Sequence, residues 1–151
     1  MPDYASLFAI SATGLRAERL RLEVAAQNLA NAHSVVSTQG EPYRPLRVLA
    51  YASGPTSFEA RLGTAQSVAA TELRGVDRVE VVPTGVEPRL DHDPGNPLAD
   101  ANGMVRVPQI NVADEMLTVM SSVRAYEANI RAMNAVKAIA ERALDIGSTR
   151  A

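Results

Sequence analysis

The chain has 151 residues, of which 46% are hydrophobic and only 4% are aromatic, and its formal net charge at pH 7 is -2. This length fits one domain with at most a small inserted module. The charge gives nucleic acid and anionic lipid no strong attraction, so we expect no nucleic-acid partner. The absence of cysteine excludes disulfide and thiolate chemistry.

The first residues lack the features of a secretion signal or a membrane anchor. No basic segment precedes an apolar stretch, and the longest apolar run, residues 7–10, is far too short for either purpose. We therefore expect no membrane insertion and no cleaved signal peptide. If the protein leaves the cytoplasm, another route must export it.

Residues 3–31 are predicted to form a long helix, which Asp3 opens. Gly14 lies inside it at a cost of about 1 kcal/mol relative to alanine, so we expect a bend there or another backbone packed closely against it. Asn28 and Asn31 are expected to satisfy backbone groups where the chain leaves the helix. Four large apolar residues recur at intervals of seven along this helix: Phe8, Leu15, Leu22 and Leu29.

The middle of the chain is predicted to be a small β and loop module. Three short segments favour strands because they are rich in valine and leucine and partly alternate: residues 46–51, 76–82 and 104–107. Residues 52–75 have no clear period and are predicted to be a loop. Prolines and glycines predict turns at 83–85 and along the run 91–103.

A second long helix is predicted from Asn111 to Gly147, with Asn111 as its N-cap and Gly147 as its stop. Its length would be roughly 50 Å at 1.5 Å per residue. Apolar residues recur at alternating steps of four and three, which is typical of a helix that buries a narrow seam against other helices. The seam consists of Val112, Met116, Val119, Val123, Tyr126, Ile130 and Met133.

One charge, Lys137, interrupts this seam. It could fix the register of a helical assembly, as polar seam residues do. The other interpretation is that the stripe drifts onto Val136, Ile139 and Ala143, because a straight helix of 3.6 residues per turn does not keep a seven-residue repeat in line. Two helical i,i+4 ion pairs are also expected, Glu127 with Arg131 and Lys137 with Glu141.

These elements predict an α+β fold with two domains. Residues 1–34 and 109–151 together would form a helical-bundle or coiled-coil domain, and residues 35–108 would form the β-rich module between them. If the two helices pair as an antiparallel hairpin, their apolar faces are wider than one partner can cover. We therefore expect apolar surface that only other subunits can bury.

The sequence offers little for catalysis or for metal binding. The run Asp91, His92, Asp93 is its only cluster of ionisable ligands, but the following residues do not match a calcium loop and favour tight turns instead. His33 lies in a polar loop, and no nucleophilic elbow, zinc spacing or phosphate-binding loop is present. We expect no enzyme activity, no cofactor and no metal.

Two stretches, one near each end, resemble the signatures of a known family. Residues 10–34, ISATGLRAERLRLEVAAQNLANAHS, followed by GEPYRP at 40–45, resemble the opening signature of the bacterial flagellar axial proteins that build rod and hook. Residues 107–147, from VPQINVADEM to ERALDIG, resemble their closing signature. Within that family, residues 92–112 are similar to the proximal-rod members, although His92 stands at a usually aromatic position and Asn96 where histidine is common.

The resemblance implies a structural subunit of the flagellar basal-body rod that polymerises through its terminal helices and transmits torque from motor to hook. It implies export of the unfolded, uncleaved chain through the flagellar type III apparatus to a rod that crosses the periplasm. The partners would be copies of the chain and other rod subunits. The expected assembly interface is Phe8, Leu15, Leu22, Leu29, Met116, Val119, Val123, Tyr126, Ile130 and Met133.

Two alternatives stay open at this point. The chain could be another axial subunit, either the other proximal-rod protein or a distal-rod protein, which cross-linking through the middle module would distinguish. It could also be a small soluble module that binds a metal or a carbohydrate through the 91–103 loop. That class predicts a folded monomer whose melting depends on the ligand.

Overall fold

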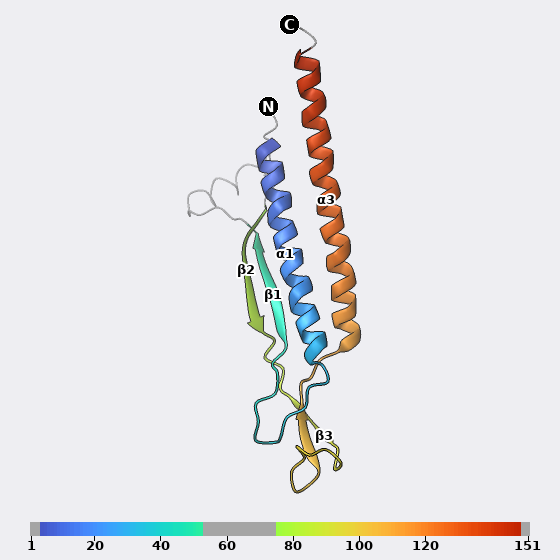
Figure 1. Ribbon diagram of the computed structural model, residues 1–151. Helices are drawn as coiled ribbons and strands as arrows, with labels where there is room; N and C mark the ends of the chain where they lie inside the picture. Colours follow the sequence, from blue (N-terminus) through green and yellow to red (C-terminus); the bar gives the residue numbers. More distant parts are fainter. Residues whose placement is uncertain (1–3, 53–74, 149–151) are drawn as a thin grey trace, which may run out of the picture. The chain divides into compact units, whose positions relative to one another are not determined.

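The structure, a computed structural model, describes residues 4–52 and 75–148 of the chain. Two long helices enclose four short strands in sequence, so the predicted α+β class is confirmed (Figure 1). The elements are α1 (Tyr4–Asn31), β1 (Leu46–Ala52), β2 (Val76–Pro83), β3 (Arg89–His92), β4 (Met104–Val107) and α3 (Val112–Ser148).

Both predicted helices are confirmed to within a residue or so at each end. The predicted cap of α3 is also confirmed, because Asn111 Oδ1 accepts a hydrogen bond from the Ala113 amide at 3.1 Å. The three predicted strands appear as β1, β2 and β4. Residues 53–74 of the predicted loop lie outside the described residues.

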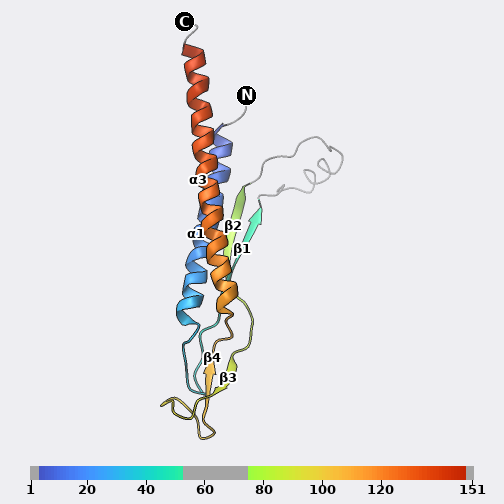
Figure 2. The ribbon, with the colours of Figure 1, turned by 90° about the vertical axis from the view of Figure 1, so that its right-hand side faces the viewer.

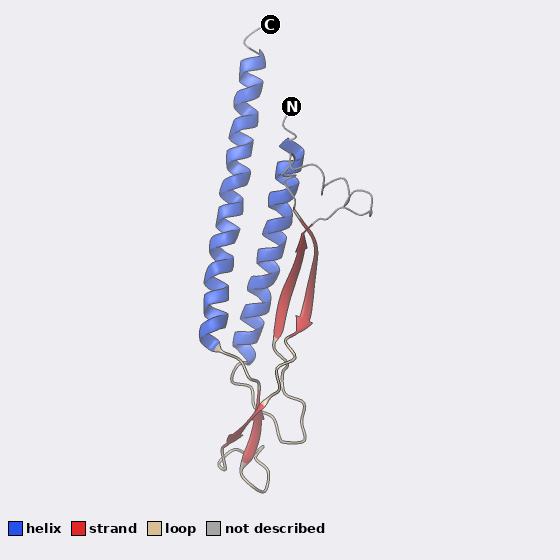
Figure 3. Ribbon diagram, turned by 180° about the vertical axis from the view of Figure 1, so that it is seen from behind, coloured by secondary structure: helices blue, strands red, loops and turns tan. Residues whose placement is uncertain are grey.

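The strands form two separate two-stranded sheets, β1 with β2 and β3 with β4 (Figure 3). The prediction missed β3 and assigned its last residues to a turn. All four β3 residues are exposed, so their sequence carries no alternation of buried and exposed side chains. The strand exists because it pairs antiparallel with β4, with Arg89 opposite Val107 and Asp91 opposite Val105.

The chain divides into two compact units, each of which contains a part of both helices. Unit 1 comprises Met1–Glu18, Ala50–Val79 and Arg124–Ala151, and unit 2 comprises Arg19–Leu49 and Glu80–Val123. Within each unit, the parts of α1 and α3 lie side by side in both views (Figures 1 and 2). The predicted division into a helical domain and a middle module stays a prediction.

Alanines and valines form most of the interior of the described part of the chain, together with a few polar side chains. In unit 1 the buried residues include Ser11 and Ala17. In unit 2 the largest fully buried side chains are Val105, Asn28 and Ser122. Few of the large apolar side chains of the helices are therefore fully buried within the described part of the chain.

Candidate assembly surface

A buried asparagine joins three segments of unit 2. Asn28 is 0% exposed, and its amide nitrogen donates to Leu46 O at 2.8 Å and to Glu115 Oε1 at 2.9 Å. Its amide oxygen accepts from the Tyr43 hydroxyl at 2.8 Å and from the Leu46 amide at 3.0 Å. One side chain thus ties α1 to the start of β1 and to the first turn of α3. The predicted role of Asn28 at a backbone group is confirmed.

The environment of Tyr43 in this network shifts the pKa of its phenol. Burial raises the pKa of Tyr43 above its usual value, and the negative charge of Glu115 raises this pKa further. The neutral phenol is the form that donates to Asn28, so the network needs a protonated Tyr43. Its charged member, Glu115, receives a donor from Asn28.

The end of α1 is closed by its own polar residues. Asn31 Nδ2 donates to Gln27 O at 2.8 Å, and the amide and hydroxyl of Ser34 both donate to Asn31 O. The two bonds from Ser34 pair the Asn31 carbonyl, which the helix end leaves without an intrahelical partner. The predicted role of Asn31 is confirmed as well.

In unit 1 the two helices approach each other closely at Gly14. A Cβ built on Gly14 would lie 3.1 Å from Oδ1 of Asn129 on α3. The predicted close approach to Gly14 is made by a side chain of α3 and not by a backbone. A side chain at position 14 would require the Asn129 amide to shift by a few tenths of an ångström.

A second close approach in unit 1 holds the start of β2 against α1. Thr13 Oγ1 donates to Ile10 O at 2.8 Å and accepts from the Val76 amide at 3.1 Å. The adjacent Gly75 leaves room for this contact, since a Cβ there would lie 2.7 Å from Thr13 Oγ1. The threonine therefore acts as a bridge between helix and strand.

The inward side of α3 is a row at intervals of seven that the sequence analysis did not identify. Glu115 and Ser122 belong to unit 2, and Asn129 belongs to unit 1. Ser122 is 1% exposed, and its hydroxyl has no hydrogen-bond partner among the described residues. We call these three residues the inner row.

Each residue of the inner row is followed by a residue of the predicted seam: Met116, Val123 and Ile130, which we call the outer row. Consecutive residues on a helix differ by about 100° in direction, so the outer row lies to one side of the contact with α1. Met116 is 57% exposed, Val123 39% and Ile130 38%, and their seam neighbour Tyr126 is 39% exposed. Val112, Val119 and Met133 are half-buried.

The same offset occurs on α1. Gly14 and Asn28, which contact α3 within their units, immediately precede Leu15 and Leu29 of the predicted interface. Phe8, Leu15, Leu22 and Leu29 are all half-buried. Of the ten predicted interface residues, Met116, Val123, Tyr126 and Ile130 are exposed and the other six are half-buried. Their role in assembly stays a prediction.

Further exposed apolar residues on α3 lie outside the predicted seam. Leu117 and Met120 belong to unit 2, and Ile139, Leu144 and Ile146 belong to unit 1. They do not belong to the predicted seam, although Ile139 is one of the positions onto which the apolar stripe was predicted to drift.

Lys137 lies on the surface with its Nζ 3.7 Å from Glu141 Oε1, and Arg131 pairs with Glu127 at 3.2 Å, so both expected i,i+4 pairs are confirmed.

The 91–103 segment is a turn built by its own side chains. Asp100 Oδ1 accepts from the amides of Asn102 and Met104, and Asn96 Nδ2 donates to Asp93 Oδ2. Within residues 4–52 and 75–148, no three His, Cys, Asp or Glu side chains are grouped so that they could hold a metal ion. Among the helices described, none has a stretch apolar and long enough to span a membrane.

Comparison with known proteins identifies the family of the chain. The family described as "Flagellar basal body rod FlgEFG protein C-terminal" matches residues 101–146. The flagellar basal-body rod protein FlgC of Salmonella typhimurium is 38% identical over 142 residues, which cover 94% of this chain and 96% of the relative. The FlgC of Bacillus subtilis is 37% identical, with coverage of 91% and 94%. The FlgC of Aquifex aeolicus is 33% identical, with coverage of 96% and 98%.

These matches run along nearly the whole length of both partners, so they include the two helices as well as the strands between them. The family match at 101–146 contains the inner and outer rows of α3. The resemblance in the terminal signatures is thereby confirmed. The chain belongs to the family of the flagellar basal-body rod protein FlgC.

Proposed function

We propose that this chain is a structural, non-enzymatic subunit of the proximal flagellar rod, which polymerises through its terminal helices and transmits torque from the motor towards the hook. The observation that carries the proposal is the outer row of α3. Met116, Val123 and Ile130 stay exposed although their helix already contacts α1 through the inner row. Full burial of such a side chain from water contributes about 1.5–3 kcal/mol, and burial of the fraction that is still exposed here favours an assembled state by a part of that.

The partners we propose are copies of this chain and other rod subunits. Phe8, Leu15, Leu22 and Leu29 on α1, with the seam on α3, would lie against equivalent helices of neighbouring subunits. A contact between two different surfaces that does not close into a ring produces an open helical polymer, as a rod requires. The family names of the relatives support this role.

We further propose that the chain reaches the rod in the periplasm unfolded and without cleavage, through the flagellar type III export apparatus. A net charge of -2 supports protein partners rather than nucleic acid. Assembly would then occur from subunits delivered to the growing end.

The test is Ile130→Asp, with Ala135→Asp as its matched control. Both positions are exposed on α3, but only Ile130 belongs to the outer row. A carboxylate buried without a partner costs several kcal/mol, so Ile130→Asp should abolish rods and swimming in a strain without its own copy. The control should swim, and both proteins should be exported at the normal level.

Secretion and rod assembly are read separately in this experiment, by immunoblot of exported subunits and by electron microscopy of basal bodies. Normal rods in the Ile130→Asp strain would contradict the proposed interface. Loss of rods in both strains would show that any negative charge on α3 is harmful, and it would equally remove the support for a specific seam.

A further inference from the structure

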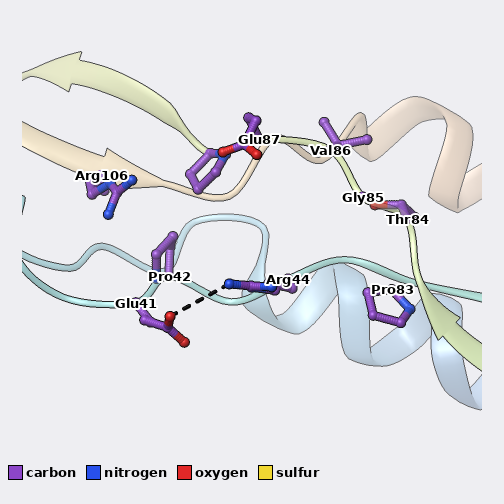
Figure 4. A pocket seen from close by; sticks show the side chains of 10 residues that line it. Glu41, Pro42, Arg44, Pro83, Thr84, Gly85, Val86, Glu87 and Arg106 are labelled. Atoms are coloured by element: carbon purple, nitrogen blue, oxygen red, sulfur yellow. Dashed lines mark ion pairs between the residues drawn. The ribbon is translucent and has the colours of Figure 1, made fainter.

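A narrow slot opens in unit 2 at the end of the sheet where β1 begins and β2 ends. The last bond of the ladder is donated by the Thr84 amide to Pro45 O at 2.8 Å. Beyond it, residues 41–44 and 85–88 diverge around a cavity of about 210 Å³, and Arg106 of β4 also lines it (Figure 4). This volume is below the roughly 300–1,000 Å³ of pockets that hold a small-molecule ligand, so the slot fits one side chain.

Arg106 is a half-buried cation that lacks a counter-ion in the described part of the chain. The single hydrogen bond of its guanidinium is from Nη1 to Gly40 O, and it is long at 3.4 Å. No carboxylate of a described residue lies within 4.0 Å of it. Since a guanidinium has five N–H donors and binds carboxylates bidentately, most of its binding capacity is unused.

The other arginine of the slot is only weakly engaged. Arg44 Nη2 lies 3.5 Å from Glu41 Oε1, and both side chains are largely exposed. Exposed pairs of this kind contribute about 0–1 kcal/mol, so Arg44 can turn towards an incoming anion at little cost. The two arginines line the slot from different segments, Arg44 from residues 41–44 and Arg106 from β4 (Figure 4).

We propose that this slot binds a carboxylate, and that the carboxylate is Asp91 of a second copy of this chain. The inference rests on the proposed function, because an open polymer needs two different and complementary surfaces on the same chain. Asp91 is exposed on β3, and its only ion pair among the described residues is a 3.7 Å contact with Arg89, itself exposed. Asp93, by contrast, is used in its turn.

The β3–β4 register keeps Asp91 away from Arg106 of the same chain. Asp91 is opposite Val105, whereas Arg106 is opposite Leu90. Successive side chains of a strand point to opposite faces, so the acid and the base lie on different faces of the hairpin. They can meet only between copies.

The test is a charge exchange. Arg106→Glu and Asp91→Arg should each lower the number of complete rods per cell by about tenfold, since truncating or reversing a buried charge contact costs at least the 1.4 kcal/mol that a factor of ten represents. The double variant, with both changes in one chain, should recover to within about twofold of the parent. Arg47→Glu is the matched control, because Arg47 is exposed on β1 in the same unit and does not line the slot.

Folding and in-chain partners are tested in parallel. Thermal melting of each purified variant must match the parent, and Arg106→Gln replaces Arg106→Glu if it does not. Glu87 lines the slot and is an acid of the same chain that could pair with Arg106 in place of Asp91. If Asp91 is the partner, Glu87→Gln should leave rods intact. A loss of rods in Glu87→Gln equal to that in Arg106→Gln, or no recovery in the double variant, would overturn the inference.

The outcome is separable from that of the proposed function. If Ile130→Asp abolishes rods while Arg106→Glu behaves like Arg47→Glu, the polymer stands and the slot is not an interface. If Ile130→Asp leaves rods intact while Arg106→Glu loses them and the double variant recovers them, the seam is not the interface and the slot is.

Discussion

The inner and outer rows of α3 differ in the contacts that they make within the chain. The inner row is polar or small, and Glu115 and Asn129 find partners within their own units, at Asn28 and Gly14. The outer row is apolar and stays exposed one residue further along. Two of the three inner-row residues thus meet α1 within the chain, whereas the outer row presents the apolar surface that we propose other subunits cover.

The largest effect on the monomer is expected at the inner contact of unit 2. Asn28→Ala removes four hydrogen bonds and leaves the buried amide and carbonyl of Leu46 without this partner. At about 1 kcal/mol per bond, the free energy of unfolding should fall by about 4 kcal/mol. The melting temperature should fall by roughly 8–16 °C.

Asn31→Ala is the matched control for that measurement. It removes one exposed hydrogen bond near the same helix end, so it should cost about 1 kcal/mol or less. Equal melting temperatures for the two variants would mean that the Asn28 network does not hold unit 2 together.

A smaller effect is expected where β2 begins in unit 1. Gly75→Ala places a Cβ 2.7 Å from Thr13 Oγ1, so the strand or the threonine must shift and the Val76–Thr13 bond is strained or lost. Overpacking of this kind typically costs about 1–3 kcal/mol. Denaturant unfolding measures the loss. Gly95→Ala, whose Cβ would make only an ordinary 3.7 Å contact, should change stability by less than about 0.5 kcal/mol.

The smallest effect is a pH dependence at Tyr43. Because the folded state raises the pKa of this phenol above 10.0, the unfolded chain ionises first as pH rises. Stability contributed by Tyr43 is therefore complete below pH 10.0 and is lost as pH rises from there towards the folded pKa. Tyr43→Phe should cost about 1 kcal/mol at neutral pH through the lost bond to Asn28.

Urea unfolding of parent and Tyr43→Phe from neutral pH to beyond the ordinary tyrosine pKa measures this difference. The gap between the two proteins should narrow at the alkaline end, since only the parent loses stability there. A gap that stays constant across the series would show that Tyr43 ionises alike in the folded and unfolded states.

The sequence was sufficient for the two helices, because the heptad spacing extends over many turns and the caps are local. It was not sufficient for the face that each helix turns inward. Asn28 and Glu115 are 87 residues apart in the chain, and neither Gly14 nor Asn129 has an apolar side chain that would mark a contact. Apolar periodicity identifies rows of large apolar residues, whereas these two contacts between α1 and α3 are made by polar and small residues.

The same limit explains the missed strand and the missed slot. Arg89–His92 has two charged residues and no buried face, so only its pairing with β4 makes it a strand. Arg106 stands in a predicted strand with an ordinary sequence. Its lack of a counter-ion becomes visible only when three separate segments come together around it.

The most direct test of the account compares the outer row in the monomer and in the rod. The chain has no cysteine, so Val123→Cys and Ile130→Cys each introduce a single thiol whose maleimide labelling reports exposure. Both thiols should label readily in the purified chain and at least about tenfold more slowly in isolated basal bodies, where a neighbouring subunit covers them. Equal labelling rates in the two states would contradict the claim that the polymer buries this row.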